Sequence, residues 1–151
     1  MKLDSVEKVL DFAIQKEQDA SEFYAEMAEK LDKQYMKDIF SQFSLEEQSH
    51  KAKLIEVKAG NLELSEPQKI LDLKIAEGLT DEVVDAKDVD FQQALIIAMK
   101  AEKASYKLYN DLADMTDDAN IKNIFLGLAQ EEAKHKLRFE IEYDDEVYKE
   151  N

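Results

Sequence analysis

Cysteine is absent from this sequence of 151 residues, and glycine and proline are scarce, with three and one. Without cysteine the chain can hold no disulfide, no cysteine-ligated iron–sulfur cluster or zinc ion, and no thiol nucleophile. Sheets of many short strands need more turn residues than this, so the composition disfavours an all-β fold. The abundant Ala, Leu, Glu, Lys and Gln favour long helices instead.

Basic residues are also few, because 20 Lys and Arg stand against 35 Asp and Glu, for a net charge of −15. This charge argues against binding nucleic acid or an anionic membrane surface, and it suits either solubility or the attraction of cations. No apolar stretch is long enough for a signal peptide or a membrane span. We therefore expect one cytoplasmic domain with no nucleic-acid or membrane partner.

Helical periodicity marks four long segments, at about residues 5–31, 33–59, 91–115 and 119–143. The links within the first and the second pair are short, which makes the paired helices antiparallel. The segment 61–90 is too long for a hairpin and contains a predicted short helix near 68–76, so it fits a crossover along the length of the fold. The sequence predicts an all-α four-helix bundle over residues 1–145, followed by an acidic tail at 146–151.

The two helix pairs are copies of each other. A shift of 85 residues aligns 12–54 with 97–139 without a gap, and 12 of the 43 pairs are identical. Such a repeat predicts two similar halves packed about a pseudo-twofold axis.

Each helix has an apolar seam, read in alternating steps of four and three residues, with a carboxylate at its midpoint. In two helices a histidine follows that carboxylate by three residues, and these are the only histidines of the chain. Four converging buried carboxylates would cost several kcal/mol or more, whereas two divalent cations would cancel their charge. Carboxylates with imidazoles suit iron or manganese. The predicted metal ligands are Glu17, Glu47, His50, Glu102, Glu132 and His135. A chance arrangement and a degenerate site without metal are the competing interpretations.

Two further pairs of residues accompany the predicted ligands. Tyr24 and Tyr109 follow Glu17 and Glu102 by seven residues each. They are either ordinary core residues or hydroxyls that donate to ligand carboxylates and act as proton donors. Glu46 and Glu131, each directly before a ligand glutamate, are expected on the solvated face.

This pattern resembles the rubrerythrin-like branch of the ferritin-like di-iron proteins, whose site takes one Glu from each of two helices and Glu-x-x-His from each of the others. The matching segments are KEQDASEFY, EEQSH, AEKASYKLY and EEAKH, and the resemblance covers nearly the whole chain. It implies a ferritin-like bundle with two iron ions, or with manganese or mixed metals. It also implies that Glu47 and Glu132 bridge the metals, with Glu17 and Glu102 terminal.

The resemblance implies a di-iron oxidoreductase of peroxidase type that reduces hydrogen peroxide or dioxygen. A ferroxidase or iron-handling protein and a non-enzymatic metal-binding bundle are the alternatives. Without cysteine, these 151 residues cannot form the rubredoxin-like domain of many rubrerythrins, so we expect electrons from an external donor, a rubredoxin-like protein or a flavoprotein reductase. The glutamate that rubrerythrins carry three residues after the third-helix ligand is Ser105 here. We expect a homodimer, and the long link allows the halves to pair within one chain or to be exchanged between chains.

Overall fold

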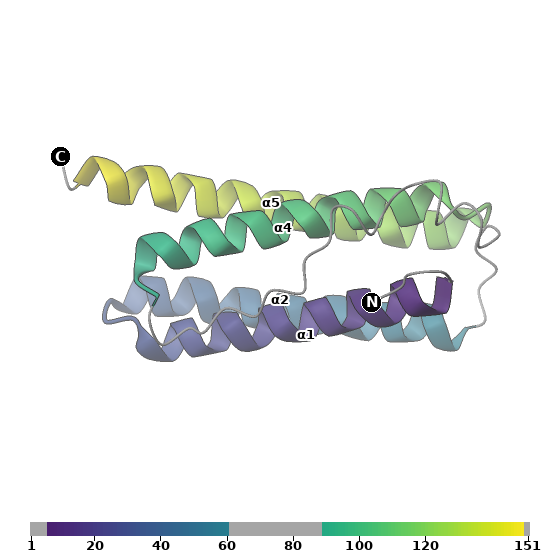
Figure 1. The fold of residues 1–151 in the computed structure, drawn as a ribbon, viewed down its shortest axis with the longest axis horizontal. Coiled ribbons are helices and arrows are strands. Elements are labelled where there is room, and N and C mark those ends of the chain that lie inside the picture. The colour runs from purple at the N-terminus through teal and green to yellow at the C-terminus, as the bar shows by residue number, and fades with distance from the viewer. Residues whose placement is uncertain (1–5, 61–88, 150–151) are drawn as a thin grey trace.

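The computed structural model describes residues 6–60 and 89–149, and the described elements are four long α-helices (Figure 1). They are α1 (Val6–Lys30), α2 (Gln34–Ala59), α4 (Phe91–Asp114) and α5 (Ala119–Lys149). Extensive contacts join α1 to α2 and α4 to α5, whereas α1 meets α4, and α2 meets α5, much more sparsely. The predicted four-helix bundle of two antiparallel pairs is confirmed, and none of the described helices is long and apolar enough to cross a membrane.

The helix ends follow local sequence signals. The Asp90 carboxylate accepts from the backbone N–H of Gln93, and the Gln93 side chain accepts from the backbone N–H of Asp90, which is a capping box for α4. The Asp118 carboxylate accepts from the first backbone N–H groups of α5. At the end of α2, the N–H of Gly60 donates to the carbonyl of Glu56. These three boundaries agree with the predicted ones.

The fourth helix is longer than its sequence pattern indicates. It continues to Lys149, through part of the predicted acidic tail, rather than ending near Tyr143. Residues 144–149 contain no glycine or proline that would stop a helix, and Arg138 donates to Glu142 one turn away. The predicted short helix near 68–76 and the predicted cap at Ser5 lie outside the described residues.

The chain enters and leaves its long link at opposite ends of the bundle. Helix α2 ends at one end and α4 begins at the other, so these two helices run parallel (Figure 1). Two antiparallel pairs connected in this way agree with the predicted crossover topology.

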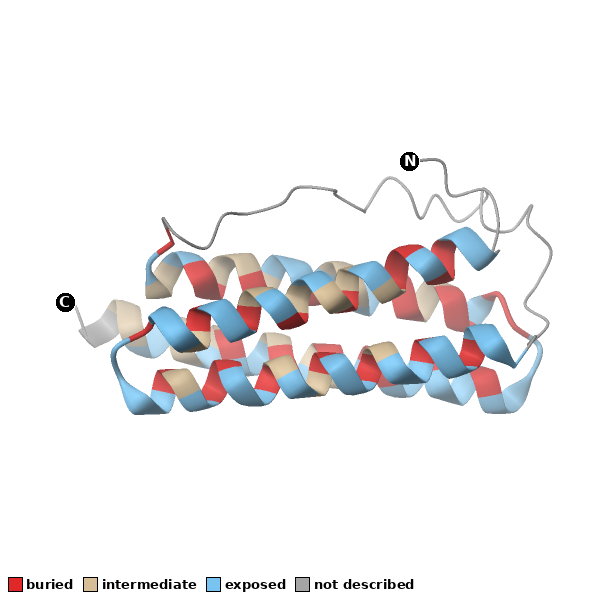
Figure 2. Cartoon of the chain, turned by 90° about the horizontal axis from the view of Figure 1, so that it is seen from below, coloured by how far each residue is buried: buried red, intermediate tan, exposed pale blue. Residues whose placement is uncertain are grey.

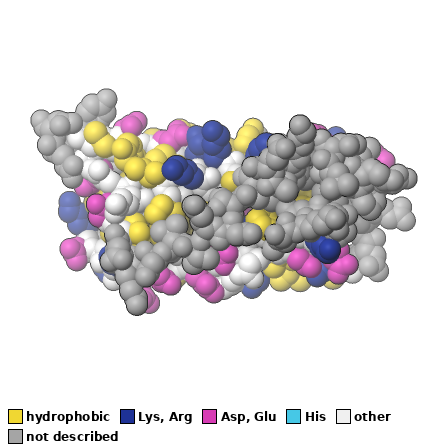
Figure 3. Space-filling view, in the orientation of Figure 1, with side chains coloured by type: hydrophobic (Ala, Val, Ile, Leu, Met, Phe, Trp, Pro, Cys, Tyr) yellow, Lys and Arg dark blue, Asp and Glu magenta, His cyan; other side chains and the backbone are white. Residues whose placement is uncertain are grey.

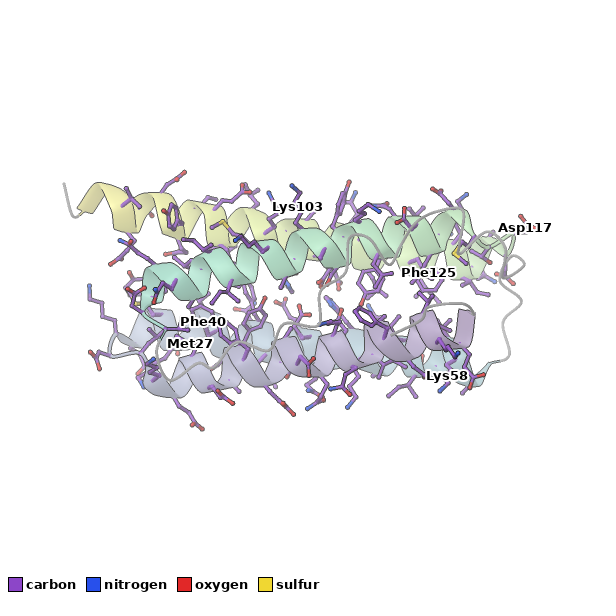
Figure 4. The ribbon with its side chains drawn as sticks, viewed as in Figure 1. Met27, Phe40, Lys58, Lys103, Asp117 and Phe125 are labelled. Atoms are coloured by element: carbon purple, nitrogen blue, oxygen red, sulfur yellow. The ribbon has the colours of Figure 1, made fainter. Side chains whose placement is uncertain are left out.

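Buried residues form stripes along the inner faces of the helices (Figure 2). One apolar cluster includes Leu54 and Phe125, and a second, toward the other end, includes Met27 and Phe40 (Figure 4). Lys103 points away from the bundle (Figure 4). On the described part of the face in Figure 3, acidic and basic side chains are interspersed. The two clusters leave the middle of the bundle to a different set of side chains.

Candidate metal centre

Six ionisable side chains fill the middle of the bundle, and we call them the polar layer. Each is at most 5% exposed. Helices α1 and α4 supply one glutamate each, and α2 and α5 each supply a glutamate and a histidine one turn apart. These residues occupy the middle of each helix's apolar seam, so they lie at the same level of the bundle. The structure thus brings together all six predicted ligands: Glu17, Glu47, His50, Glu102, Glu132 and His135.

The polar layer divides into two overlapping groups whose ligand atoms lie within 4.8 Å of one another. The first is Glu17, Glu47, His50 and Glu132, and the second is Glu47, Glu102, Glu132 and His135. Each group has its own histidine and its own outer glutamate, while Glu47 and Glu132 belong to both. This sharing matches the bridging and terminal roles that the family resemblance implies.

Contacts with the histidines give the same division. Nδ1 of His50 lies 2.7 Å from Oε1 of Glu132 and 3.8 Å from Oε1 of Glu47. Nδ1 of His135 lies 3.0 Å from Oε1 of Glu47 and 3.9 Å from Oε1 of Glu132. The outer glutamates approach one histidine each, Glu17 toward His50 and Glu102 toward His135, both at 3.5 Å. Glu47 and Glu132 therefore lie between the two imidazoles.

The inward-facing atoms of the layer lack hydrogen-bond partners. One carboxylate oxygen of each of the four glutamates and Nδ1 of both histidines are buried and make no hydrogen bond. A buried polar atom without a partner costs free energy, and six of them converging on one place is a costly arrangement. Oxygen and imidazole nitrogen donors aimed at two shared points are what a pair of transition-metal ions requires. The residues present therefore fit a two-metal site.

Burial and mutual repulsion strongly perturb the central carboxyls. Burial raises the pKa of Glu47 well above its ordinary value, and the charge of Glu102 raises it further. Burial likewise raises the pKa of Glu132, again with a contribution from Glu102. Burial also acts to raise the pKa of Glu17, but close contacts with Glu47 and His50 outweigh it and lower the value. The raised pKa values favour protonation of the central pair, and a bound cation would oppose it.

The histidines are held by carboxylates on both sides. Burial lowers the pKa of each imidazole, but the contact with Glu17 for His50, and with Glu102 for His135, outweighs it, so both pKa values rise. The two rings are nearly parallel, with centroids 5.7 Å apart and an interplanar angle of 14°. The arrangement of charges is therefore similar in the two halves, as the repeat predicts.

The two tyrosines are linked to the polar layer across the bundle. The hydroxyl of Tyr24 donates to Oε1 of Glu102 at 2.6 Å, and that of Tyr109 donates to Oε1 of Glu17. Burial, and then the charge of the glutamate it contacts, raises the pKa of each tyrosine well above its ordinary value. Of the two interpretations of these residues, the structure supports hydroxyls that donate to the predicted ligands.

Glu46 and Glu131 lie at the solvated surface, as expected, but each also contacts a histidine of the polar layer. Oε2 of Glu46 lies 2.9 Å from Nε2 of His135, and Glu131 contacts Nε2 of His50. A metal-binding histidine commonly donates its second ring N–H to a carboxylate, which fixes the orientation of the ring. Both glutamate side chains are 41–45% exposed, so each is in contact with solvent and with a buried histidine. The sequence signal for this contact was that the same glutamate recurs in both EExxH segments.

A cavity of about 380 Å³ reaches the polar layer from the side of α1 and α4. Glu47, Glu102 and Glu132 contribute to its lining, and so does Ser105. Ser105 therefore faces the site, as its spacing from Glu102 predicts. The described residues thus leave a space larger than a water molecule beside the polar layer.

Comparisons with known proteins agree with this geometry. A family model described as Rubrerythrin matches residues 8–143, which is well over half of the chain. A solved structure of a hypothetical protein from Pyrococcus furiosus is similar, with a TM-score of 0.69 at 24% sequence identity, covering 93% of this chain and 89% of that one. At this identity the likeness shows the fold alone. A comparison with curated proteins gave no significant match.

Proposed function

The chain belongs to the rubrerythrin family, and we propose that it is a di-iron oxidoreductase that reduces hydrogen peroxide or dioxygen. The observation that carries this proposal is the set of six buried donor atoms without hydrogen bonds, arranged in two overlapping groups. A structural bundle gains nothing from such a layer, since apolar packing of the same volume is usually at least as stable.

We propose a place for each residue of the polar layer around two ions. Glu17 and His50 would hold one iron, Glu102 and His135 the other, and Glu47 and Glu132 would be shared. Four carboxylates balance the four charges of two ferrous ions, which removes the repulsion that perturbs the central carboxyls. When bound, two neighbouring irons supply two electrons to an O–O bond.

The residues around the layer supply orientation and protons. Glu46 and Glu131 hold the imidazoles from outside the layer. Tyr24 and Tyr109 hold protons at Glu102 and Glu17, and they are the proton donors that we propose for the reaction. Reduction of hydrogen peroxide consumes two electrons and two protons and yields two waters. We propose that the electrons come from an external donor, a rubredoxin-like protein or a flavoprotein reductase.

Steady-state turnover tests this function. Iron-loaded protein, supplied with a reduced rubredoxin-like donor and its reductase, should oxidise that donor when hydrogen peroxide or dioxygen is added. Glu47→Ala, which loses a shared carboxylate, is the matched inactive control. Donor oxidation no faster than with Glu47→Ala, for both oxidants, would contradict the proposal.

The second candidate is a ferroxidase or iron-handling protein, in which iron is the substrate. The net charge of −15 favours it, because an acidic surface attracts cations. Size-exclusion chromatography separates the two candidates, since iron storage requires a shell of many subunits. We propose a cytoplasmic homodimer, and a small assembly of this kind would favour the oxidoreductase.

A further inference from the structure

The cavity between α1 and α4 is built from helix faces that do not pack closely. Its volume is about 380 Å³, and both helices line it with residues at helical spacing. Part of the lining is small side chains, which leave the space between the helices unfilled: Ala13 and Ala20 from α1, and Ala98, Ala101, Ala104 and Ser105 from α4. Helices α1 and α4 make few contacts with each other, which agrees with a space between them.

The wall and the floor of the cavity differ in chemistry. Phe12, Phe23, Ile97 and Leu108 make the wall apolar, while Glu47, Glu102 and Glu132 form part of the floor. Other charged side chains also line it, and all of them except Lys16 are exposed: Lys16, Asp19, Glu22, Glu26 and Lys100. A molecule in this cavity would have its apolar part against the wall and its reactive end at the polar layer.

The volume is much larger than the smallest candidate substrates need. Hydrogen peroxide and dioxygen are close in size to water, which takes up about 30 Å³ in the liquid. Pockets for organic ligands start at roughly 300 Å³ and are mostly apolar, with a few polar groups that fix orientation. The cavity belongs to the second class by both size and lining.

We propose that the substrate is an organic hydroperoxide with a compact apolar group, which occupies this cavity with its O–O end at the carboxylate floor. The inference rests on the proposed function, reduction of an O–O bond, and names a larger substrate with the same bond. The apolar group would be removed from water against the wall, and this favours binding in proportion to the area buried. Hydrogen peroxide has no such group and gains nothing from the wall.

The reaction balances with the external donor already required. The O–O bond of the hydroperoxide breaks as two electrons arrive from the rubredoxin-like or flavoprotein donor, and two protons are taken up. One oxygen stays on carbon as the alcohol, and the other leaves as water.

Cumene hydroperoxide and hydrogen peroxide, compared as substrates of the iron-loaded protein, test this preference. We expect kcat/KM for cumene hydroperoxide to exceed that for hydrogen peroxide by about tenfold or more, since each methylene in an apolar pocket is worth a large factor. A ratio of one or below would overturn the inference and leave the proposed function standing. Turnover with neither peroxide and none with dioxygen would contradict the proposed function itself.

A pair of matched variants places the effect in the cavity. Ala20→Leu adds three carbons to a residue that lines the cavity, and Ala25→Leu adds the same carbons to an exposed position of the same helix. We expect Ala20→Leu to lower the ratio of the two kcat/KM values by about tenfold. Ala25→Leu should leave the ratio unchanged. Equal ratios in the two variants would contradict binding between α1 and α4.

Binding of the alcohol product gives a readout that does not depend on turnover. 2-Phenylpropan-2-ol, added to iron-loaded and to chelated protein, should occupy the cavity in soaked crystals, and Ala20→Leu should exclude it. A cavity filled by another part of the chain or by a second copy, with no density for the alcohol, would overturn the inference.

Discussion

The two apolar clusters and the polar layer between them are equally buried, yet they have opposite effects on stability. In the cluster around Phe40, the rings of Tyr24, Phe40 and Phe139 have centroids 5.6–5.8 Å apart, and burial of such side chains favours folding. In the polar layer, six inward atoms are buried without a hydrogen bond. The clusters hold the fold together, and the layer is a cost that a bound metal would offset.

Tyr24 shows how the two regions are joined. Its ring belongs to the cluster around Phe40, while its hydroxyl donates to Glu102 in the polar layer. Tyr109 does the same from the other cluster toward Glu17. The packing that stabilises the bundle thus also fixes the positions of the predicted ligands, so the site does not depend on loops.

The largest expected effect is the loss of metal from a change in the polar layer. Glu47→Ala removes a carboxylate that both groups share and leaves three for four positive charges. We expect it to release most of the bound iron, and Glu132→Ala to do the same. Metal analysis after gel filtration measures this. A Glu47→Ala variant that keeps two metals at wild-type affinity would show that the site is elsewhere.

A change in an apolar cluster should lower stability but leave metal binding intact. Leu54 is fully buried, so Leu54→Ala should lower the free energy of unfolding by about 2–5 kcal/mol, both with metal and after chelation. It should still bind the same amount of iron. Thermal unfolding with and without chelator measures the first effect, and metal analysis the second. If Leu54→Ala lost its iron while still folded, the clusters and the layer would not be separable.

The fold and the six residues of the polar layer could be predicted from the sequence, because both follow from helical spacing. Glu17 and Glu47 lie on apolar seams, and the repeat gives Glu102 and Glu132 the same positions. The one-turn spacing from Glu47 to His50 directs both side chains toward the same point.

The contacts of Glu46 and Glu131 could not be predicted in the same way. Each lies one residue from the seam, which is a solvent-facing position within its own helix. Its partner is a histidine on the other half of the chain, so the contact depends on how α2 and α5 lie side by side. The cavity escaped prediction for a similar reason, because it arises from two faces of small residues that meet only in the folded bundle.

These outer contacts provide the next prediction. Glu131→Gln keeps the size of the side chain but removes the charge that orients His50. We expect metal affinity to fall by about 10–100-fold, the usual cost of losing such a contact. Competition with a chromophoric chelator measures it. Glu56→Gln, at an exposed position of α2, is the control, and equal affinities in the two variants would contradict the role of Glu131.

The pH dependence of the metal-free protein should show the cost of the layer. The pKa values of Glu47 and Glu132 are raised above 4.5, and those of His50 and His135 above 6.5, so the folded chain keeps protons that the unfolded chain has lost. Stability then falls as pH rises through these windows. The pKa of Glu17 shifts the other way, and its contribution is complete above 4.5.

We therefore expect the melting temperature of chelated protein to be lower at about pH 8 than at about pH 5.5. Added metal should raise it more at the higher pH, because binding displaces protons. Glu132→Gln should flatten the dependence. A melting temperature of the chelated protein that rises with pH would contradict the electrostatic description of the layer.

The smallest expected effect concerns movement of the metals between oxidation states, which we expect not to occur. Ser105 is short and neutral and cannot act as an anionic ligand, and its repeat partner Ala20 offers no ligand atom. Each metal should then keep its own histidine when oxidised and when reduced, at about 2.0–2.3 Å, near the usual imidazole distance. Crystal structures of both states measure this. A metal that moves away from His50 by about 1 Å or more would contradict it, and Ser105→Glu should introduce such movement.

The central claim is that the polar layer holds two irons, and metal analysis tests it most directly. Protein purified from iron-sufficient cells should contain about two irons per chain, as a layer of this composition requires. Its optical spectrum should show a ligand-to-iron charge-transfer band that disappears on chelation, together with a drop of several degrees in melting temperature. A chain with no more iron than its Glu47→Ala variant, and a melting curve that chelation leaves unchanged, would contradict the account.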